Sequence, residues 1–322
     1  MTHNLHTPWI VRIAERGHIA VLPAVWLMFS LGYYWIVYTY SDGRGCCWAT
    51  DANLWGVIAT YSAIPGYILL IATYLWRQTN KLLDDLRLTD AESVKAQVLN
   101  PPLWYPLAFC TVAGSVAISQ YVDTLRQISV LDNLWLDLSM ISSNLITWVL
   151  CAWLVSYRIS AGIAMMKLGK IYPVDLYNLS EVRPFGRMAI LDLLFAMGIL
   201  ALIPLQSLDF EVRWVNYQDA LLFVLPLALA MALLPMWGVH QAILEQKLTK
   251  TRALQNVVDE ADHDDLARME ALLSHRDRIA NLSTWPLDTT LASRILLYVI
   301  LPPLAWSAAA LVEALLERFI SN

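Results

Sequence analysis

The sequence has little charge and few of the residues that build catalytic centres. Only 15% of its 322 residues are Asp, Glu, Lys or Arg, whereas soluble domains usually carry about 25%. Of its four cysteines, the adjacent Cys46 and Cys47 suggest free thiols or a link to another chain. It contains no glycine-rich phosphate loop, no H-E-x-x-H or G-x-S-x-G motif and no metal-spaced Cys/His set. We therefore expect no enzymatic activity, no catalytic residues, no metal, no cofactor and no nucleic acid partner.

Apolar residues make up 58% of the chain, and the mean hydropathy is +0.50. They concentrate in runs that are each about as long as the roughly 20 residues needed by a membrane-spanning helix. Backbone N–H and C=O groups cannot stay unpaired in lipid, so helices are expected. The sequence predicts an all-α, polytopic membrane bundle with seven spans, near 19–40, 54–76, 103–121, 135–157, 188–206, 219–238 and 294–316.

Lys and Arg lie mostly on one side of this layout. Segments 1–18, 77–102, 158–187 and 239–294 hold 18 of the 22. Cytoplasmic segments carry such an excess, so, if all seven runs span, we expect a cytoplasmic N-terminus, an outer C-terminus and the inner (plasma) membrane of the cell as location. Arg158 is the first residue of the predicted cytoplasmic segment 158–187. Tryptophans at the predicted inner ends of spans fit an interfacial belt: Trp76, Trp104, Trp237 and Trp285.

The cytoplasmic segments are long and helix-like. The fourth span is expected to continue as a helix up to Tyr172-Pro173. Residues 241–290 carry apolar residues at helical spacing in two stretches, which predicts a helical hairpin with arms of roughly 30 Å. We expect it to pack on itself, on the extended fourth span or on another subunit; a solvated linker is the alternative. The predicted domains are a transmembrane bundle (1–240), this hairpin or anchor, and a last helix (291–322).

The last predicted span is unusual because Pro302 and Pro303 stand side by side near its middle. Proline removes a backbone donor, and a lipid-facing helix tolerates the resulting kink poorly. The span is therefore expected to be sheltered by protein or to border water. Ser307, Glu313 and Glu317 follow toward its outer end. We expect these five residues to line or gate a pore, with a kinked packing helix as the alternative.

The fourth span carries an uncharged polar seam. Ser139, Ser143 and Thr147 recur every four residues, and Asn144 lies beside them. Such a seam faces protein or water rather than lipid. As an interhelical hydrogen-bonding seam it requires no further function.

Other polar or reactive groups near the spans have simpler interpretations. Asp192 lies close to the inner end of the fifth span and is expected to reach interfacial water. His240 and His275 are expected to face water. Cys110 and Cys151 fall at similar depth in neighbouring spans and are interpreted as buried, inert thiols.

Two resemblances can be stated. The blocks YPVDLYNLSEVRPFGRMAILDLL, LLPMWGVHQAILEQK and STWPLDTTLASRILLYVILPPLAW resemble recurring segments of a family of uncharacterised bacterial integral membrane proteins. This likeness covers mainly the second half of the chain and implies no function. Separately, the layout resembles the seven-transmembrane ion channel superfamily that includes insect odorant and gustatory receptors.

The second resemblance is one of topology: a cytoplasmic N-terminus, seven spans, short outer loops, long inner helices and an outer C-terminus. The short C-terminal motif of the insect receptors is absent. The resemblance implies that the inner helices form an anchor that assembles tetramers, and that the outer part of the last span lines the pore.

We therefore expect an oligomeric ion channel that passes cations, with Glu313 and Glu317 at its outer mouth. Its expected partners are the lipid bilayer, ions and further copies of the chain, in a tetramer if the resemblance holds. A secondary transporter is an alternative, against which stand the odd number of spans and the absence of a repeat or a charged midplane site. A membrane sensor or scaffold that docks a partner through the hairpin is the other alternative.

Overall fold

The computed structural model describes residues 11–12, 20–41, 55–86, 91–99, 101–119, 134–205, 224–260 and 266–285, with the single residues 293, 297 and 300. This part of the chain is helical and contains no strand, so the predicted all-α fold is confirmed. The expected pore or gating residues lie outside the described residues, as do the adjacent cysteines: Pro302, Pro303, Ser307, Glu313, Glu317, Cys46 and Cys47.

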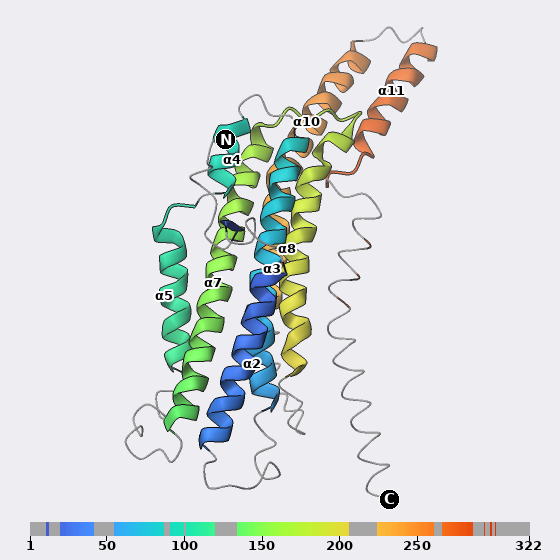
Figure 1. The fold of residues 1–322 in the computed structure, drawn as a ribbon. Helices are drawn as coiled ribbons and strands as arrows, with labels where there is room; N and C mark the ends of the chain where they lie inside the picture. The colour runs from blue at the N-terminus through green and yellow to red at the C-terminus, as the bar shows by residue number, and fades with distance from the viewer. Residues whose placement is uncertain are drawn as a thin grey trace, which may run out of the picture.

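Long helices stand side by side in one bundle (Figure 1). Two short helical elements lie between them, α4 (Ala91–Leu99) after α3 and η2 (Leu179–Val182) before α8. The long helices are α2 (Val21–Ser41), α3 (Trp55–Asp85), α5 (Trp104–Ser119), α7 (Leu134–Ile171), α8 (Arg183–Leu202) and α10 (Leu225–Asp259).

Five segments of the described chain are long and apolar enough to cross a membrane. Each overlaps one of the predicted spans two to six, and the segments on α7 and α10 continue well beyond the predicted ends at 157 and 238. The apolar part of α2, Val21–Trp35, is shorter than these five segments and is not counted among them. The five segments are Ile58–Asp85, Ser93–Ser119, Leu138–Ile171, Leu179–Leu205 and Leu225–Asp259.

Helix α7 is the centre of the bundle. It packs against α2, α3, α4, α5, α8 and α10. Its 38 residues give it a length of about 57 Å, so it exceeds a bilayer core of roughly 30 Å. It ends at Ile171, directly before Tyr172-Pro173, where the sequence predicts a break. The buried side chains of α8 fill the core beside it, and the largest of them are Phe185, Met188, Leu193, Phe195 and Leu200.

Glycines bring α7 and α10 into backbone contact. A Cβ added to Gly238 on α10 would lie 1.9 Å from the carbonyl oxygen of Met166 on α7. A Cβ added to Gly169 on α7 would lie 2.7 Å from the backbone nitrogen of Val239. Only residues without a side chain permit such a crossing, which maximises van der Waals contact where apolar lipid supplies no hydrophobic driving force.

A third glycine seats a tyrosine between α3 and α8. The hydroxyl of Tyr67 lies 3.1 Å from the carbonyl oxygen of Leu194 and 3.3 Å from that of Phe195. A Cβ on Gly198 would lie 2.0 Å from this hydroxyl oxygen. Gly198 therefore leaves the space in which Tyr67 reaches the backbone of α8.

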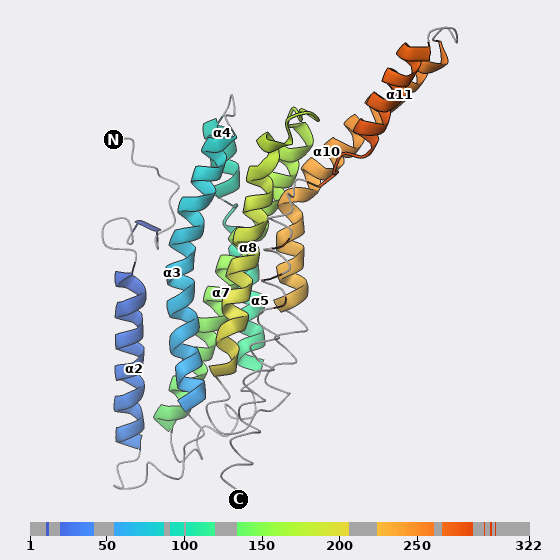
Figure 2. The same ribbon diagram turned by 90° about the vertical axis from the view of Figure 1, so that its right-hand side faces the viewer.

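Helix α10 extends beyond the bundle and pairs with α11 (Leu266–Ala280) (Figures 1 and 2). The pair is antiparallel, because residues later in α10 contact residues earlier in α11. Lys247 Nζ donates to the carbonyl oxygens of Ala280 (2.8 Å) and Leu282 (2.6 Å), and Arg276 Nη1 donates to Gln255 Oε1 (2.7 Å). The helix passes unbroken through residue 241, where the sequence analysis divides bundle from hairpin.

Candidate functional site

An ion pair lies in the interior of the bundle. Arg158 Nε on α7 donates to Asp192 Oδ1 on α8, and the two side chains are 6% and 0% exposed. The expectation that Asp192 reaches interfacial water is wrong, because its side chain is fully buried. Arg158, which the sequence places in the segment after the fourth span, is buried as well. Helix α7 does continue past residue 157, but Arg158 is on the side that packs against α3 and α8.

The rest of the guanidinium group is bonded to two further side chains. Arg158 Nη1 donates to Thr79 Oγ1 on α3 (2.9 Å), and Nη2 lies 3.1 Å from Met188 Sδ on α8. Three helices therefore meet at this group. Asp192 Oδ2, in contrast, is buried and has no hydrogen-bond partner among the described residues. A buried carboxylate is stabilised only as far as its oxygens are paired, so the partners of Asp192 satisfy it on one side only.

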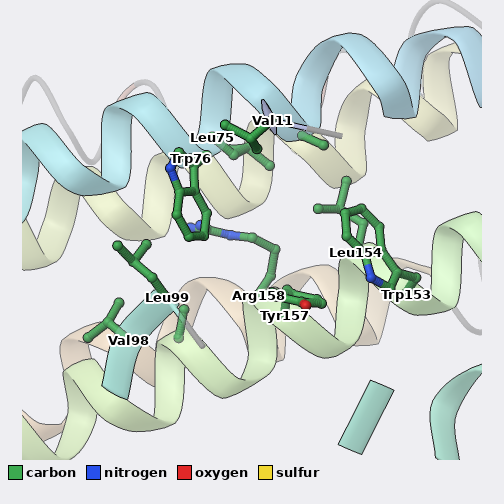
Figure 3. Close-up of a pocket in the computed structure, with 11 residues that line it drawn as sticks. Val11, Leu75, Trp76, Val98, Leu99, Trp153, Leu154, Tyr157 and Arg158 are labelled. Atoms are coloured by element: carbon green, nitrogen blue, oxygen red, sulfur yellow. The ribbon is translucent and has the colours of Figure 1, made fainter. Parts of the chain in front are cut away.

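A small cavity of about 30 Å³ adjoins Arg158. Figure 3 shows the Arg158 side chain reaching from α7 toward α3, with Trp76 on the other side of the space. The volume is enough for one or two water molecules, but most of the walls are apolar and offer few hydrogen bonds. The labelled lining residues are Val11, Leu75, Trp76, Val98, Leu99, Trp153, Leu154, Tyr157 and Arg158.

The predicted polar seam connects α7 to three neighbouring helices. Tyr34 on α2 donates its hydroxyl to Ser143 Oγ. Tyr61 on α3 donates to Asn144 Oδ1 (3.2 Å), and Asn144 Nδ2 donates to the carbonyl oxygen of Ala117 on α5 (3.4 Å). These contacts are those of an interhelical hydrogen-bonding seam, in which polar side chains hold helices together within an apolar environment.

The other two seam residues are buried on the same helix. Thr147 Oγ1 donates to the carbonyl oxygen of Ser143 (2.8 Å), and the carbonyl oxygen of Ser139 accepts from Ser142 Oγ (2.9 Å). From Thr147 to Arg158 the distance along α7 is about 16 Å. The seam and the ion pair are thus two separate polar regions at different depths of the bundle.

Aromatic contacts join α10 to the segment after α11. The His240 ring stacks on Trp285 with centroids 4.2 Å apart, and its Nδ1 lies 2.9 Å from the carbonyl oxygen of Thr284. His275 Nε2 lies 2.8 Å from the hydroxyl oxygen of Tyr177. Both histidines were predicted to face water, and both are partly exposed. His240 also joins α10 to the segment after α11, and His275 joins α11 to the segment before α8.

The two thiols in the spans are free and partly buried. Cys110 Sγ on α5 lies 3.6 Å from the carbonyl oxygen of Val149 on α7. Val149 is two residues from Cys151, which agrees with the predicted similar depth of the two cysteines.

Sequence reasoning missed Arg158 and Thr79 as partners of Asp192. A signal for the pair was present: Arg158 follows the predicted end of span four by one residue, and Asp192 lies a turn inside span five. Consecutive spans that run in opposite directions bring such positions to the same level. For Thr79 no comparable signal exists, because one hydroxyl in a polar segment is unremarkable.

Comparisons of the chain with protein-family models, with curated proteins and with solved structures find no match. The class of protein is therefore inferred from the fold and its buried contacts. The described part of the chain is all-helical, and five of its segments are long and apolar enough to span a bilayer, as in a polytopic membrane protein. Within the described residues no three His, Cys, Asp or Glu side chains are grouped so that they could hold a metal ion.

Proposed function

We propose that the chain forms an oligomeric, cation-conducting channel in the bacterial inner membrane. It has seven spans, a cytoplasmic N-terminus and an outer C-terminus. The observation that carries this proposal is an exposed apolar stripe on α10 that continues from the bundle into the projecting helical pair. The topological likeness to the seven-transmembrane ion channel superfamily supports it as well.

The stripe consists of large apolar side chains that are each between 41% and 48% exposed. Their separations of four, four, seven and four residues keep them on one face of the helix. The first three suit contact with lipid. The last two lie beyond Trp237, where the helix pairs with α11, and there apolar surface is stabilised by burial against protein. The residues are Leu229, Leu233, Trp237, Leu244 and Leu248.

The partner that fits this stripe is a second copy of the chain. The part of the stripe within the bundle then contacts lipid, and the part beyond the bundle contacts the neighbouring subunit. In such an assembly α10 and α11 form the anchor. The following predicted span, 294–316, is placed around the common axis, with Ser307 beyond its double proline and Glu313 and Glu317 at the outer mouth. The superfamily likeness implies a tetramer.

Replacing Leu244 and Leu248 together with Glu should dissociate the oligomer, because two charges would have to be buried in the subunit interface. Val257→Glu is a matched control: Val257 is 43% exposed on the same helix but faces the opposite side. Mass photometry in nanodiscs should give a single-subunit mass for the double variant and an oligomer mass for the control. A wild-type chain that runs as a monomer would contradict the proposed assembly.

Glu313→Gln should reduce the preference for cations over anions, because it removes one negative charge per subunit from the outer mouth. Reversal potentials under a salt gradient in planar bilayers measure this preference. Unchanged reversal potentials would remove Glu313 from the pore. Absence of ion flux through wild-type protein in liposomes would contradict the channel itself.

The buried Arg158–Asp192 pair favours a second candidate, a secondary transporter. Ionisable residues inside a membrane bundle are rare and commonly mark substrate or proton pathways. Saturable uptake driven by an ion gradient, without unitary currents, would favour this candidate over the channel. Asp192→Asn should then abolish uptake.

A further inference from the structure

A groove of about 440 Å³ opens where α7 ends against α10. It lies between the last turn of α7, the Tyr172-Pro173 break and the part of α10 that leaves the bundle. Its volume is within the range of roughly 300–1,000 Å³ that is typical of small-molecule sites. Its polar lining residues are Lys170, Tyr172, Glu245, Gln246, Thr249 and Lys250.

Two lysines give the groove its charge. Lys170 comes from α7 and Lys250 from α10, so the two lysines line the groove from different helices. Lys250 Nζ also lies 4.8 Å from the centre of the Tyr177 ring, a cation–π contact. Glu245 carries the opposite charge. The formal charge of the lining is therefore +1.

The groove begins next to an aromatic cluster, since its lining residue Ala242 follows His240 by two positions on α10. Gly169, next to Lys170, packs on Val239, two residues after Trp237. Trp237, His240 and Trp285 form an aromatic cluster at this level. Such clusters mark the membrane–water interface. A lipid whose phosphate lies at the level of this cluster would therefore meet the groove, which extends from there along α10.

We propose that this groove binds a phosphate group, held between Lys170 and Lys250. Lysine ammonium groups bind phosphate as point charges. Basic pockets between spans at the cytoplasmic side commonly hold lipid headgroups. The same chemistry suits a soluble phosphate ligand, which would enter from the water side. This site does not depend on whether the chain conducts ions.

Native mass spectrometry of the full chain in a neutral detergent, titrated with phosphatidylglycerol, tests the lipid source. Isothermal calorimetry with inorganic phosphate tests the soluble source. We expect Lys170→Gln and Lys250→Gln each to weaken binding about fivefold, and the pair about 25-fold. Lys81→Gln removes the same charge from an exposed site on α3 outside the groove, and should leave binding unchanged.

Glu245→Gln is the opposite test. It raises the formal charge of the lining from +1 to +2 and should tighten binding by a similar factor, which a merely destabilising change would not do. If the protein binds the lipid but not inorganic phosphate, the site is assigned to a lipid headgroup. If it binds inorganic phosphate and the lysine variants weaken that binding, the site is assigned to a soluble ligand. Binding of neither probe, or equal effects of the Lys81 and groove variants, would overturn the proposal.

Discussion

Replacing Asp192 with Ala is expected to lower the free energy of unfolding by about 3–5 kcal/mol. The change leaves the Arg158 guanidinium buried between α3, α7 and α8 without its counter-charge. Thr79 and Met188 are uncharged and cannot replace the carboxylate. Equilibrium unfolding in mixed micelles, followed by loss of helical signal, measures the effect.

The ion pair between Arg187 and Asp85 is a suitable control. Its atoms are 3.8 Å apart and its side chains are 55% and 43% exposed, so Asp85→Ala should cost less than about 1 kcal/mol. If Asp192→Ala costs no more than this control, the buried pair does not stabilise the bundle.

Removing both charges separates stability from function. An Arg158→Met, Asp192→Leu double variant should recover most of the lost stability, because apolar groups of similar volume replace a buried ion pair without leaving a charge unpaired. Asp192 Oδ2 has no hydrogen-bond partner in the described bundle, so the ion pair does not fully offset the cost of burying the carboxylate. A double variant that is stable but loses ion flux or uptake would therefore show that the charges serve transport.

The spans in the described part of the chain could be predicted because lipid imposes a simple rule on them. A run of apolar residues must become a helix of about bilayer length. Helix α3 begins at Trp55 and α7 at Leu134, each one residue from the predicted start. The end of α7 followed from Tyr172-Pro173, since the residue before a proline disfavours the helical conformation.

The contacts between helices could not be predicted in the same way. Of the partners of Arg158, Asp192 and Thr79 are separated from it by 34 and 79 residues in the chain. Their meeting depends on how α3, α7 and α8 are rotated about their axes, and hydropathy does not determine that rotation. The seam differs, because four polar residues on one helix face define a direction by themselves. For that reason Ser143 and Asn144 could be recognised, but not Tyr34 and Tyr61.

The glycines show the same limit. Glycine is common in membrane helices, and nothing in the sequence distinguishes Gly238, which meets a backbone carbonyl, from Gly32, which meets nothing within 4 Å. Only the crossing of α7 and α10 separates the two. This difference makes them a matched pair for experiment.

Replacing Gly238 with Ala is expected to separate α7 from α10 and to destabilise the protein by about 2–3 kcal/mol. The added Cβ would lie 1.9 Å from the carbonyl oxygen of Met166, and a backbone atom cannot rotate away as a side chain can. The helices must move apart, which also loosens the contact of Gly169 with Val239. This loss exceeds the gain of up to about 1 kcal/mol that alanine brings to a helix.

Gly32→Ala receives only that gain, so its unfolding free energy should stay the same or rise by up to about 1 kcal/mol. Equal stability of the two variants would mean that α7 and α10 do not cross in backbone contact. The Gly238 variant should also lower the oligomer mass in nanodiscs, because α10 carries both the crossing and the Leu244–Leu248 surface. A variant that loses stability but keeps its oligomer would place the subunit interface elsewhere than on α10.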